Sequence, residues 1–322
     1  MSAGAFDRRA FVAACGAAVL AAPSRASVTQ HLVFGAYASR LPPSPAHNGY
    51  VPPTDLKTIR DIYSRMTAAV MINGQGPYQF VVDTGANQSA IAAELAAQLS
   101  LEDGGRRPVN GVAGVQITPT ALANLKVGAR PAADAVLSVL TQAAIGGQGM
   151  LGLDQLDGGR VTLDFQNQSL SITPGRGGGA LDDEVAVRAQ LRDGQLTLVD
   201  ADVGGIKVTA FLDSGAQDTI GNMALRRLAL TRYPAIPWRQ TPIISVTGQT
   251  MAAEMADLPA LRIGGMHVPS WPVAFADLHT FQMWGLVDQP SILIGVDILS
   301  RFESVCLDFA RDEVRFRLPP HG

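Results

Sequence analysis

Two stretches of the chain repeat the same order of apolar and polar positions. In each, two strand-like apolar runs flank a tight turn, Asn73-Gly74 in the first stretch and Gly204-Gly205 in the second. Glycine-containing pairs between such runs predict β-hairpins, and Asn-Gly is the strongest of these signals. The second run then ends at a carboxylate, a hydroxyl residue and a glycine: Asp83-Thr84-Gly85 in FVVDTGAN and Asp213-Ser214-Gly215 in AFLDSGAQ. The pattern predicts two hairpins that each lead into a polar turn.

Both stretches also continue and end alike. A short helical pattern follows each triplet, at residues 89–99 and 221–229. Later in each stretch, two large apolar residues precede a glycine, an aspartate stands two residues after the glycine, and the tripeptide LDF follows. The first stretch contains GMLGLDQL and then VTLDF, and the second contains ILIGVDIL and then VCLDF. This internal repeat indicates a tandem duplication. Together with 33 glycines and 20 prolines, which favour many turns, it predicts an all-β fold of two tandem β-barrel lobes with a cleft between them.

The chain divides by composition around this repeat. A proline-rich segment precedes the first unit, and the glycine-rich run PGRGGGALDDE separates the two units. We expect a signal peptide, a proline-rich leader, an N-terminal lobe, a flexible linker and a C-terminal lobe, at residues 1–26, 27–54, 55–173, 174–187 and 188–318.

The first residues predict export. Arg8-Arg9 precede an alanine-rich apolar run, residues 10–22, and Ser24-Arg25-Ala26 offers small residues where a signal peptidase reads. DRRAFVA resembles the twin-arginine export motif, so we expect a periplasmic protein. The apolar run is too short to span a bilayer as a helix. An alternative is a lipoprotein attached through Cys15.

Composition argues against several other functions. The net charge is −3 with no long basic run, which gives no support to nucleic-acid binding. The five histidines are scattered without metal-ligand spacing, so we expect neither a metal nor an organic cofactor. After removal of a signal peptide one cysteine remains, Cys306, in the apolar run SVCLDF; we expect an inert buried thiol.

The two triplets resemble the catalytic turns of retropepsin-like aspartic proteases, in a single-chain bacterial form with two fused lobes. DSGAQDTIG (213–221) is similar to the D-T-G-A-x-D-T run of the retroviral enzymes, and DTGANQSAI (83–91) fits it more loosely. Leu151-Gly152 and Ile294-Gly295 match the family's apolar-apolar-Gly element. The resemblance covers roughly residues 60–172 and 195–317.

Paired carboxylates suit this chemistry. Two carboxyls within hydrogen-bond distance cannot both ionise, so one activates water while the other, protonated, polarises the substrate carbonyl. Asp83 and Asp213 are the candidate catalytic pair. Gly85 and Gly215 allow backbone N–H groups to approach the carboxylates. The resemblance implies that the hydroxyls of Thr84 and Ser214 bond across to the opposite lobe and support the pair.

The resemblance also implies two flexible hairpins, or flaps, over an extended peptide substrate. The candidate first flap is Val109–Gly114, and the candidate second flap is Ser245–Gln249; within them Asn110, Gly111, Val112, Thr247 and Gly248 are the candidate contacts. An extended peptide would pair with them as an added strand. The apolar run Phe281–Trp284 is expected to pack in the core, the alternatives being a specificity pocket or a docking surface. Asp154, Asp297, Asp164 and Asp308 are expected to be structural.

Alanines at 86 and 216 follow the glycines, where pepsin-like enzymes often place a hydroxyl that would lower a carboxylate pKa. We therefore expect a pH optimum at roughly 5–7. The main hypothesis is a monomeric aspartic endopeptidase that acts by limited proteolysis on periplasmic or envelope proteins, monomeric because both aspartates are in one chain. The alternatives are a catalytically silent peptide-binding or scaffold protein and a pepsin-like enzyme proper.

Overall fold

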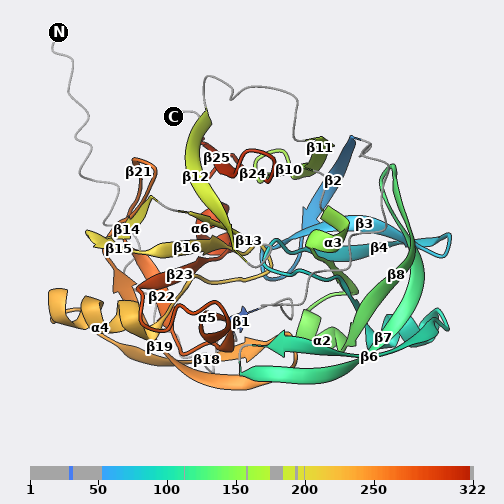
Figure 1. Cartoon of the computed structure of the whole chain (residues 1–322), viewed down its shortest axis with the longest axis horizontal. Coiled ribbons are helices and arrows are strands. Elements are labelled where there is room, and N and C mark those ends of the chain that lie inside the picture. The colour runs from blue at the N-terminus through green and yellow to red at the C-terminus, as the bar shows by residue number, and fades with distance from the viewer. Residues whose placement is uncertain are drawn as a thin grey trace, which may run out of the picture.

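The computed structural model describes residues 29–31, 53–111, 113–156, 159–174, 184–192, 195–198 and 200–319. The predicted signal peptide and Cys15 lie outside the described residues, as does most of the leader. Among the residues described, no helix is long and apolar enough to cross a membrane. The chain folds mainly into strands, with short helices at the same points of the two repeats (Figure 1).

The N-terminal lobe is a barrel-like set of strands with three short helices. Its strands are β2 (Thr54–Arg60), β3 (Met66–Ile72), β4 (Gln75–Val82), β5 (Ala90–Ala92), β6 (Glu102–Gly111), β7 (Gly114–Val127), β8 (Arg130–Leu140), β9 (Gly149–Leu151), β10 (Gly159–Asp164) and β11 (Ser169–Pro174). Its helices are α1 (Ala93–Gln98), α2 (Gln142–Ile145) and α3 (Leu153–Leu156).

The C-terminal lobe repeats this plan. Its strands are β12 (Glu184–Arg192), β13 (Gln195–Leu198), β14 (Ala201–Val203), β15 (Ile206–Lys207), β16 (Thr209–Leu212), β17 (Ile220–Gly221), β18 (Arg239–Ser245), β19 (Thr250–Leu258), β20 (Leu261–Ile263), β21 (Met266–Val268), β22 (Trp271–Phe275), β23 (Ser291–Ile294), β24 (Ser304–Asp308) and β25 (Glu313–Arg317). Its helices are α4 (Met223–Arg232), α5 (His279–Met283) and α6 (Val296–Leu299).

The predicted hairpins form. Asn73 and Gly74 both have positive φ, 49° and 79°, between β3 and β4. A tight hairpin turn of this kind needs φ above zero at both central residues, which Asn and Gly tolerate best. Gly204 and Gly205, with φ of 56° and 82°, make the corresponding turn between β14 and β15. The predicted helices also form, but they begin later than expected, at Ala93 and Met223.

In each lobe, the strand that ends just before the aspartate pairs with the strand that contains the two apolar residues of the apolar-apolar-Gly element. In the N-terminal lobe β4 pairs in parallel with β9, so that Val82 lies opposite Leu151, and β5 pairs with β9 from the other side. In the C-terminal lobe β16 pairs with β23, so that Leu212 lies opposite Ile294, and β17 completes the set. The duplication seen in the sequence is therefore a duplication of strand topology.

A six-stranded antiparallel sheet joins the lobes along the upper edge of Figure 1. Its order is β2-β11-β10-β24-β25-β12, and the lobes meet where β10 pairs with β24. Residues 184–187, which composition assigned to the linker, are the start of β12 in this sheet; residues 175–183 are not described. Glu184–Arg188 pair with the last strand, β25, so this segment belongs to the folded body.

Two expectations about apolar residues are met. Cys306 lies in β24 at the junction and is buried, and burial raises the pKa of its thiol above the ordinary value, consistent with an inert side chain. Phe281 and Trp284 are buried in the core of the C-terminal lobe, where the Trp284 ring stacks on Phe211 with centroids 4.0 Å apart.

Candidate active site

The loops that carry Asp83 and Asp213 meet at the junction of the lobes. Each aspartate follows directly after the buried end of a strand, β4 or β16, and its backbone N–H continues the parallel pairing. Asp83 N–H donates to Leu151 O at 2.9 Å, and Asp213 N–H donates to Ile294 O at 2.9 Å. The carboxyls are 0% and 1% exposed. The repeated apolar-to-carboxylate pattern thus positions two buried acids at equivalent points.

The hydroxyl residues after the aspartates lock these loops together. Thr84 Oγ1 donates to Leu212 O at 3.1 Å, and Ser214 Oγ donates to Val82 O at 2.8 Å. In return Thr84 N–H donates to Ser214 Oγ at 3.0 Å, and Ser214 N–H donates to Thr84 Oγ1 at 3.1 Å. All four bonds cross between the lobes, so each hydroxyl satisfies two backbone groups of the other half.

Gly85 and Gly215 place backbone directly against the carboxyls. A Cβ on Gly85 would overlap the Asp213 carboxyl, and one on Gly215 would overlap that of Asp83. Gly85 N–H donates to Asp83 Oδ1 at 2.8 Å, and Gly215 N–H donates to Asp213 Oδ1 at 2.9 Å. Ala216 N–H also donates to Asp213 Oδ1, at 3.0 Å, so the alanine supplies a backbone donor in place of a hydroxyl.

One oxygen of each carboxyl, Oδ2, is a buried acceptor. Neither Asp83 Oδ2 nor Asp213 Oδ2 receives a hydrogen bond from the described part of the protein. Two buried carboxyls in such proximity cannot both be charged, so one of them keeps its proton. The pair can therefore both accept a proton from water and donate a hydrogen bond to a carbonyl.

Both carboxyls hold protons more tightly than ordinary aspartates. Burial raises the pKa of Asp83 to about 6, against the opposing effects of its hydrogen bonds with Asp213 and Gly85 and of the Arg65 charge. Burial, followed by the negative charge of Asp83, raises the pKa of Asp213 well above its usual value. These are the shifts expected of two acids that share one proton.

The two candidate flaps are hairpin tips that touch. The first flap lies at the turn from β6 to β7, and the second at the turn from β18 to β19. Gly111 has no room for a side chain: a Cβ there would collide with Thr247 Oγ1 and lie 2.8 Å from Ser245 Oγ. Gly248 makes the second turn with φ of 79°. Val112 lies outside the described residues.

Asn110 ties the first flap to the opposite lobe. Its side chain is buried, and its Oδ1 lies 3.2 Å from Nε2 of His279 at the start of α5. The flap contact and this bond both cross between the lobes.

Asp154 and Asp297, interpreted as structural, support the loops from behind. Ser89 Oγ donates to Asp154 Oδ1 and Thr219 Oγ1 donates to Asp297 Oδ1, both at 2.7 Å. The same hydroxyls accept from the backbone N–H of Gly152 and Gly295. Burial raises the pKa of both aspartates, that of Asp297 to about 7. They fasten the loop after each aspartate turn to the apolar-apolar-Gly element.

Sequence analysis missed two residues that reach the turns of the aspartate pair. Arg65 comes just before β3, and Gln195 opens β13, at the same number of residues before Asp83 and Asp213 respectively. Arg65 Nη1 donates to Gly215 O at 3.4 Å, and Gln195 Nε2 donates to Gly85 O at 3.1 Å. Their equal spacing from the aspartates is the signal that could have revealed them, although the two side chains differ in chemistry.

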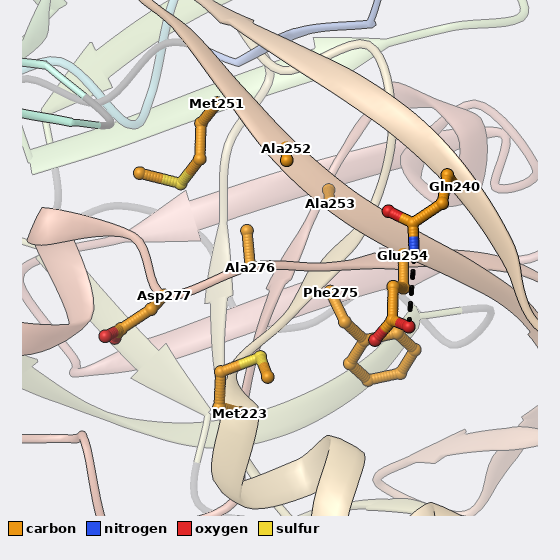
Figure 2. A pocket seen from close by; sticks show the side chains of 9 residues that line it. All are labelled: Met223, Gln240, Met251, Ala252, Ala253, Glu254, Phe275, Ala276 and Asp277. Carbon is orange, nitrogen blue, oxygen red and sulfur yellow. Dashed lines mark hydrogen bonds between the residues drawn. The ribbon is translucent and has the colours of Figure 1, made fainter.

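A separate open pocket of about 590 Å³ lies on the C-terminal lobe (Figure 2). Met251–Glu254 of β19 form one wall, and Phe275–Asp277 and Met223 form the other. Neither aspartate nor any flap-tip residue lines it. This pocket is therefore distinct from the aspartate pair. Within the described ranges, no group of three or more His, Cys, Asp or Glu side chains is arranged to hold a metal ion.

Comparison with known families agrees with this geometry. The family described as gag-polyprotein putative aspartyl protease matches residues 68–157, and the family described as aspartyl protease matches residues 199–298. The two matches fall on the two lobes, each includes one aspartate of the pair, and together they span more than half of the chain. A comparison with curated proteins gives no match. The chain belongs to the retropepsin-like aspartic proteases, with two tandem protease lobes in one polypeptide.

Proposed function

We propose that the chain is an aspartic endopeptidase in which Asp83 and Asp213 together activate one water molecule. The observation that carries the proposal is the pair itself: two buried carboxyls on interlocked loops, with raised pKa values and an Oδ2 atom on each that has no hydrogen-bond partner within the described protein. A protein that only bound peptides would gain nothing from holding two acids in repulsive proximity.

The geometry accounts for each step of hydrolysis. The ionised carboxyl takes a proton from water while the water oxygen bonds to the peptide carbonyl carbon; the protonated carboxyl donates to the carbonyl oxygen. The tetrahedral intermediate then collapses as the C–N bond breaks and the amine leaves with a proton from the pair. No covalent bond to the protein forms. The products are a carboxylic acid and an amine. After they depart, the aspartate pair again holds one shared proton, as at the start.

Further parts of the proposal concern substrate and location. The touching flap tips suit a peptide bound in extended form beneath them, where backbone pairing supplies affinity. Both aspartates belong to one chain, which supports a monomer. Arg8-Arg9 and the following apolar run support export to the periplasm, with limited cleavage of periplasmic or envelope proteins as the role. Immunodetection in osmotic-shock fractions, beside an Arg8→Lys/Arg9→Lys variant, tests the location.

The activity is tested by cleavage of a mixed peptide library from pH 3 to 8. The chain from residue 27 is compared with Asp83→Asn and Asp213→Asn, which keep the size of the side chain, and with a pepstatin-type transition-state mimic. We expect cleavage that the mimic blocks and that either substitution abolishes. Cleavage that survives one substitution would exclude a shared pair. A folded wild-type chain that binds peptides without cutting them would favour the alternative of a silent binding protein.

A further inference from the structure

The aspartate pair sits in a nearly two-fold symmetric frame in which one position breaks the symmetry of charge. We propose that Arg65 is a positioning residue that decides which aspartate carries the shared proton, making Asp83 the ionised member and Asp213 the protonated one. The inference rests on the proposed function, because it assigns separate roles to the two acids within that reaction.

Arg65 is fixed in one conformation by three partners. Its side chain is 1% exposed, and its Nε donates to Asp61 Oδ2 at 2.8 Å. Nη2 donates to Ile145 O at 2.9 Å, and Nη1 reaches across the lobe junction to Gly215 O at 3.4 Å. A buried guanidinium held in this way keeps its charge and its orientation.

Gln195 occupies the equivalent position in the C-terminal lobe. It is 3% exposed, and its Nε2 donates to Gly85 O at 3.1 Å and to Asn87 Oδ1 at 2.8 Å. Both residues thus perform the same structural task, which is to hold the glycine turn of the opposite lobe by its carbonyl. One does so with a cation and the other with a neutral amide.

The two glycines place the cation of Arg65 and the neutral amide of Gln195 next to different aspartates. Gly215, bonded by Arg65, packs against the Asp83 carboxyl, whereas Gly85, bonded by Gln195, packs against Asp213. The fixed positive charge therefore lies on the side of Asp83. In a buried setting a nearby cation favours the ionised carboxylate. The Arg65 charge accordingly opposes the burial that raises the pKa of Asp83.

The other charges around the pair do not cancel this effect. Asp61 neutralises part of the guanidinium charge, but it contacts Nε and Nη2, leaving Nη1 directed at the Gly215 turn. Asp213 acts in the same direction as Arg65, because its hydrogen bond also lowers the pKa of Asp83, whereas the charge of Asp83 raises the pKa of Asp213. Gln195 and Asn87, which face the Asp213 side, are neutral.

This assignment gives the two acids fixed tasks. Asp83 is the base that takes a proton from water, and Asp213 donates its hydrogen bond to the substrate carbonyl. In a symmetric pair the proton would lie on either aspartate. A peptide bound in one chain direction can react with only one of these two protonation states. The single arginine removes that ambiguity before the substrate binds.

The test is a carboxyl-carbon NMR titration of the full mature chain labelled at aspartate, with the two signals assigned from Asp83→Asn and Asp213→Asn. We expect Asp83 to ionise first in the wild type. In Arg65→Gln, which makes the frame neutral on both sides, we expect the Asp83 midpoint to rise by about 1 pH unit. In Arg65→Lys, which keeps the charge, the midpoint should stay closer to that of the wild type.

The swapped variant Arg65→Gln/Gln195→Arg makes the outcome decisive, because it moves the cation to the Asp213 side and should reverse the order of ionisation. An unchanged order in the folded double variant would overturn the inference. If the Arg65 variants do not fold, the wild-type titration still decides, since ionisation of Asp213 before Asp83 contradicts the assignment. A chain that ionises Asp83 first but cleaves no peptide would refute the proposed function and leave the charge assignment standing.

Discussion

Thr84 and Ser214 hold the two lobes together at the catalytic turns by exchanging hydrogen bonds, each hydroxyl accepting from the other residue's backbone N–H. Each hydroxyl also donates to a carbonyl of the other lobe, Leu212 O for Thr84 and Val82 O for Ser214. Both residues are essentially unexposed, so water does not compete for these bonds. The contact therefore couples the docking of the lobes to the geometry of the aspartate pair.

Removal of one hydroxyl should weaken both the docking of the lobes and the geometry of the aspartate pair. Thr84→Val keeps the shape of the side chain but leaves Leu212 O and Ser214 N–H without their partner, at roughly 1–3 kcal/mol for each buried group. Thr84→Ser keeps the hydroxyl and copies the residue used in the other lobe, so it serves as the matched control. Denaturant unfolding and peptide cleavage should separate the two variants clearly. Equal stability of Thr84→Val and Thr84→Ser would show that the cross-lobe bonds contribute little.

The glycines of the catalytic turns should tolerate no side chain. In Gly85→Ala the new Cβ would overlap the Asp213 carboxyl, and in Gly215→Ala it would overlap Asp83. Small displacements of catalytic groups can lower rates roughly 100-fold, and we expect losses of at least that order in kcat/KM. Gly147→Ala is the control, because its Cβ would come no closer than 3.6 Å to its nearest neighbour. A Gly85→Ala chain as active as the Gly147→Ala chain would contradict the packing described.

The pH profile of kcat/KM should be bell-shaped with its acid side near pH 6. Below the pKa of Asp83, raised to about 6, both carboxyls are protonated and neither can accept a proton from water. As the pH rises through this value the singly ionised pair forms and activity appears; it is lost again when Asp213, whose pKa is raised further, gives up its proton. Initial rates across buffers of constant ionic strength would measure both sides. A maximum below about pH 3 would refute the cause given for these shifts.

The sequence predicted the parts of the structure that depend on local pattern. Asn73-Gly74 identified a hairpin because few residues accept two positive φ values in succession. The repeated triplets identified the two turns that bring Asp83 and Asp213 together, because each triplet follows an apolar strand. The family and the all-β two-lobe fold are confirmed.

The sequence did not reveal the contacts between the two repeated units, because these depend on which strands and side chains of one lobe meet those of the other. Nothing in the strand pattern of residues 159–164 shows that they pair with residues 304–308, because antiparallel pairing leaves no mark of its partner. The glycine-rich composition near residue 180 also obscured the start of β12. Arg65 and Gln195 escaped notice since neither is chemically distinctive alone; their meaning comes from the carbonyls that they reach.

The first flap should be sensitive to a single methyl group. Gly111→Ala would bring a Cβ into Thr247 Oγ1 and within 2.8 Å of Ser245 Oγ, so the flap tips could not meet as they do here. Because the flaps are proposed to cover the substrate, we expect KM to rise several-fold with a smaller change in kcat. Thr247→Ala in the same chain removes the closest obstacle and should recover part of the loss. Rescue would be absent if the two tips did not touch in solution.

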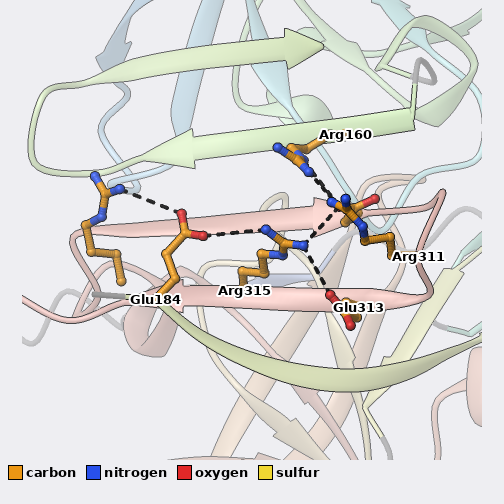
Figure 3. Close-up of polar contacts among 7 residues, drawn as sticks. Arg160, Glu184, Arg311, Glu313 and Arg315 are labelled. Atoms are coloured by element: carbon orange, nitrogen blue, oxygen red, sulfur yellow. Dashed lines mark hydrogen bonds and ion pairs between the residues drawn. The ribbon is translucent and has the colours of Figure 1, made fainter. Parts of the chain in front are cut away.

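The LDF aspartates, equivalent in sequence, should differ sharply in their effect on stability. Asp308 is fully buried beside Arg160 of the N-terminal lobe, whose Nη2 lies 3.0 Å from its Oδ2, and beside Arg311 and Arg315. Figure 3 labels these three arginines. Asp164 instead accepts from Asn167 in an exposed turn. Breaking a buried ion pair from one side costs about 3–5 kcal/mol, so Asp308→Asn should lower the free energy of unfolding by that amount.

Asp164→Asn is the matched control, with an expected loss of at most about 1 kcal/mol because its partners can turn to water. The Arg160 contact joins β10 to β24, so Asp308→Asn should also loosen the docking of the lobes and not only one of them. Hydrogen exchange would show this as faster exchange in both β10 and β24. Similar unfolding free energies for the two variants, or faster exchange confined to β24, would mean that the lobes are joined by the backbone ladder of the six-stranded sheet and not by the charges set within it.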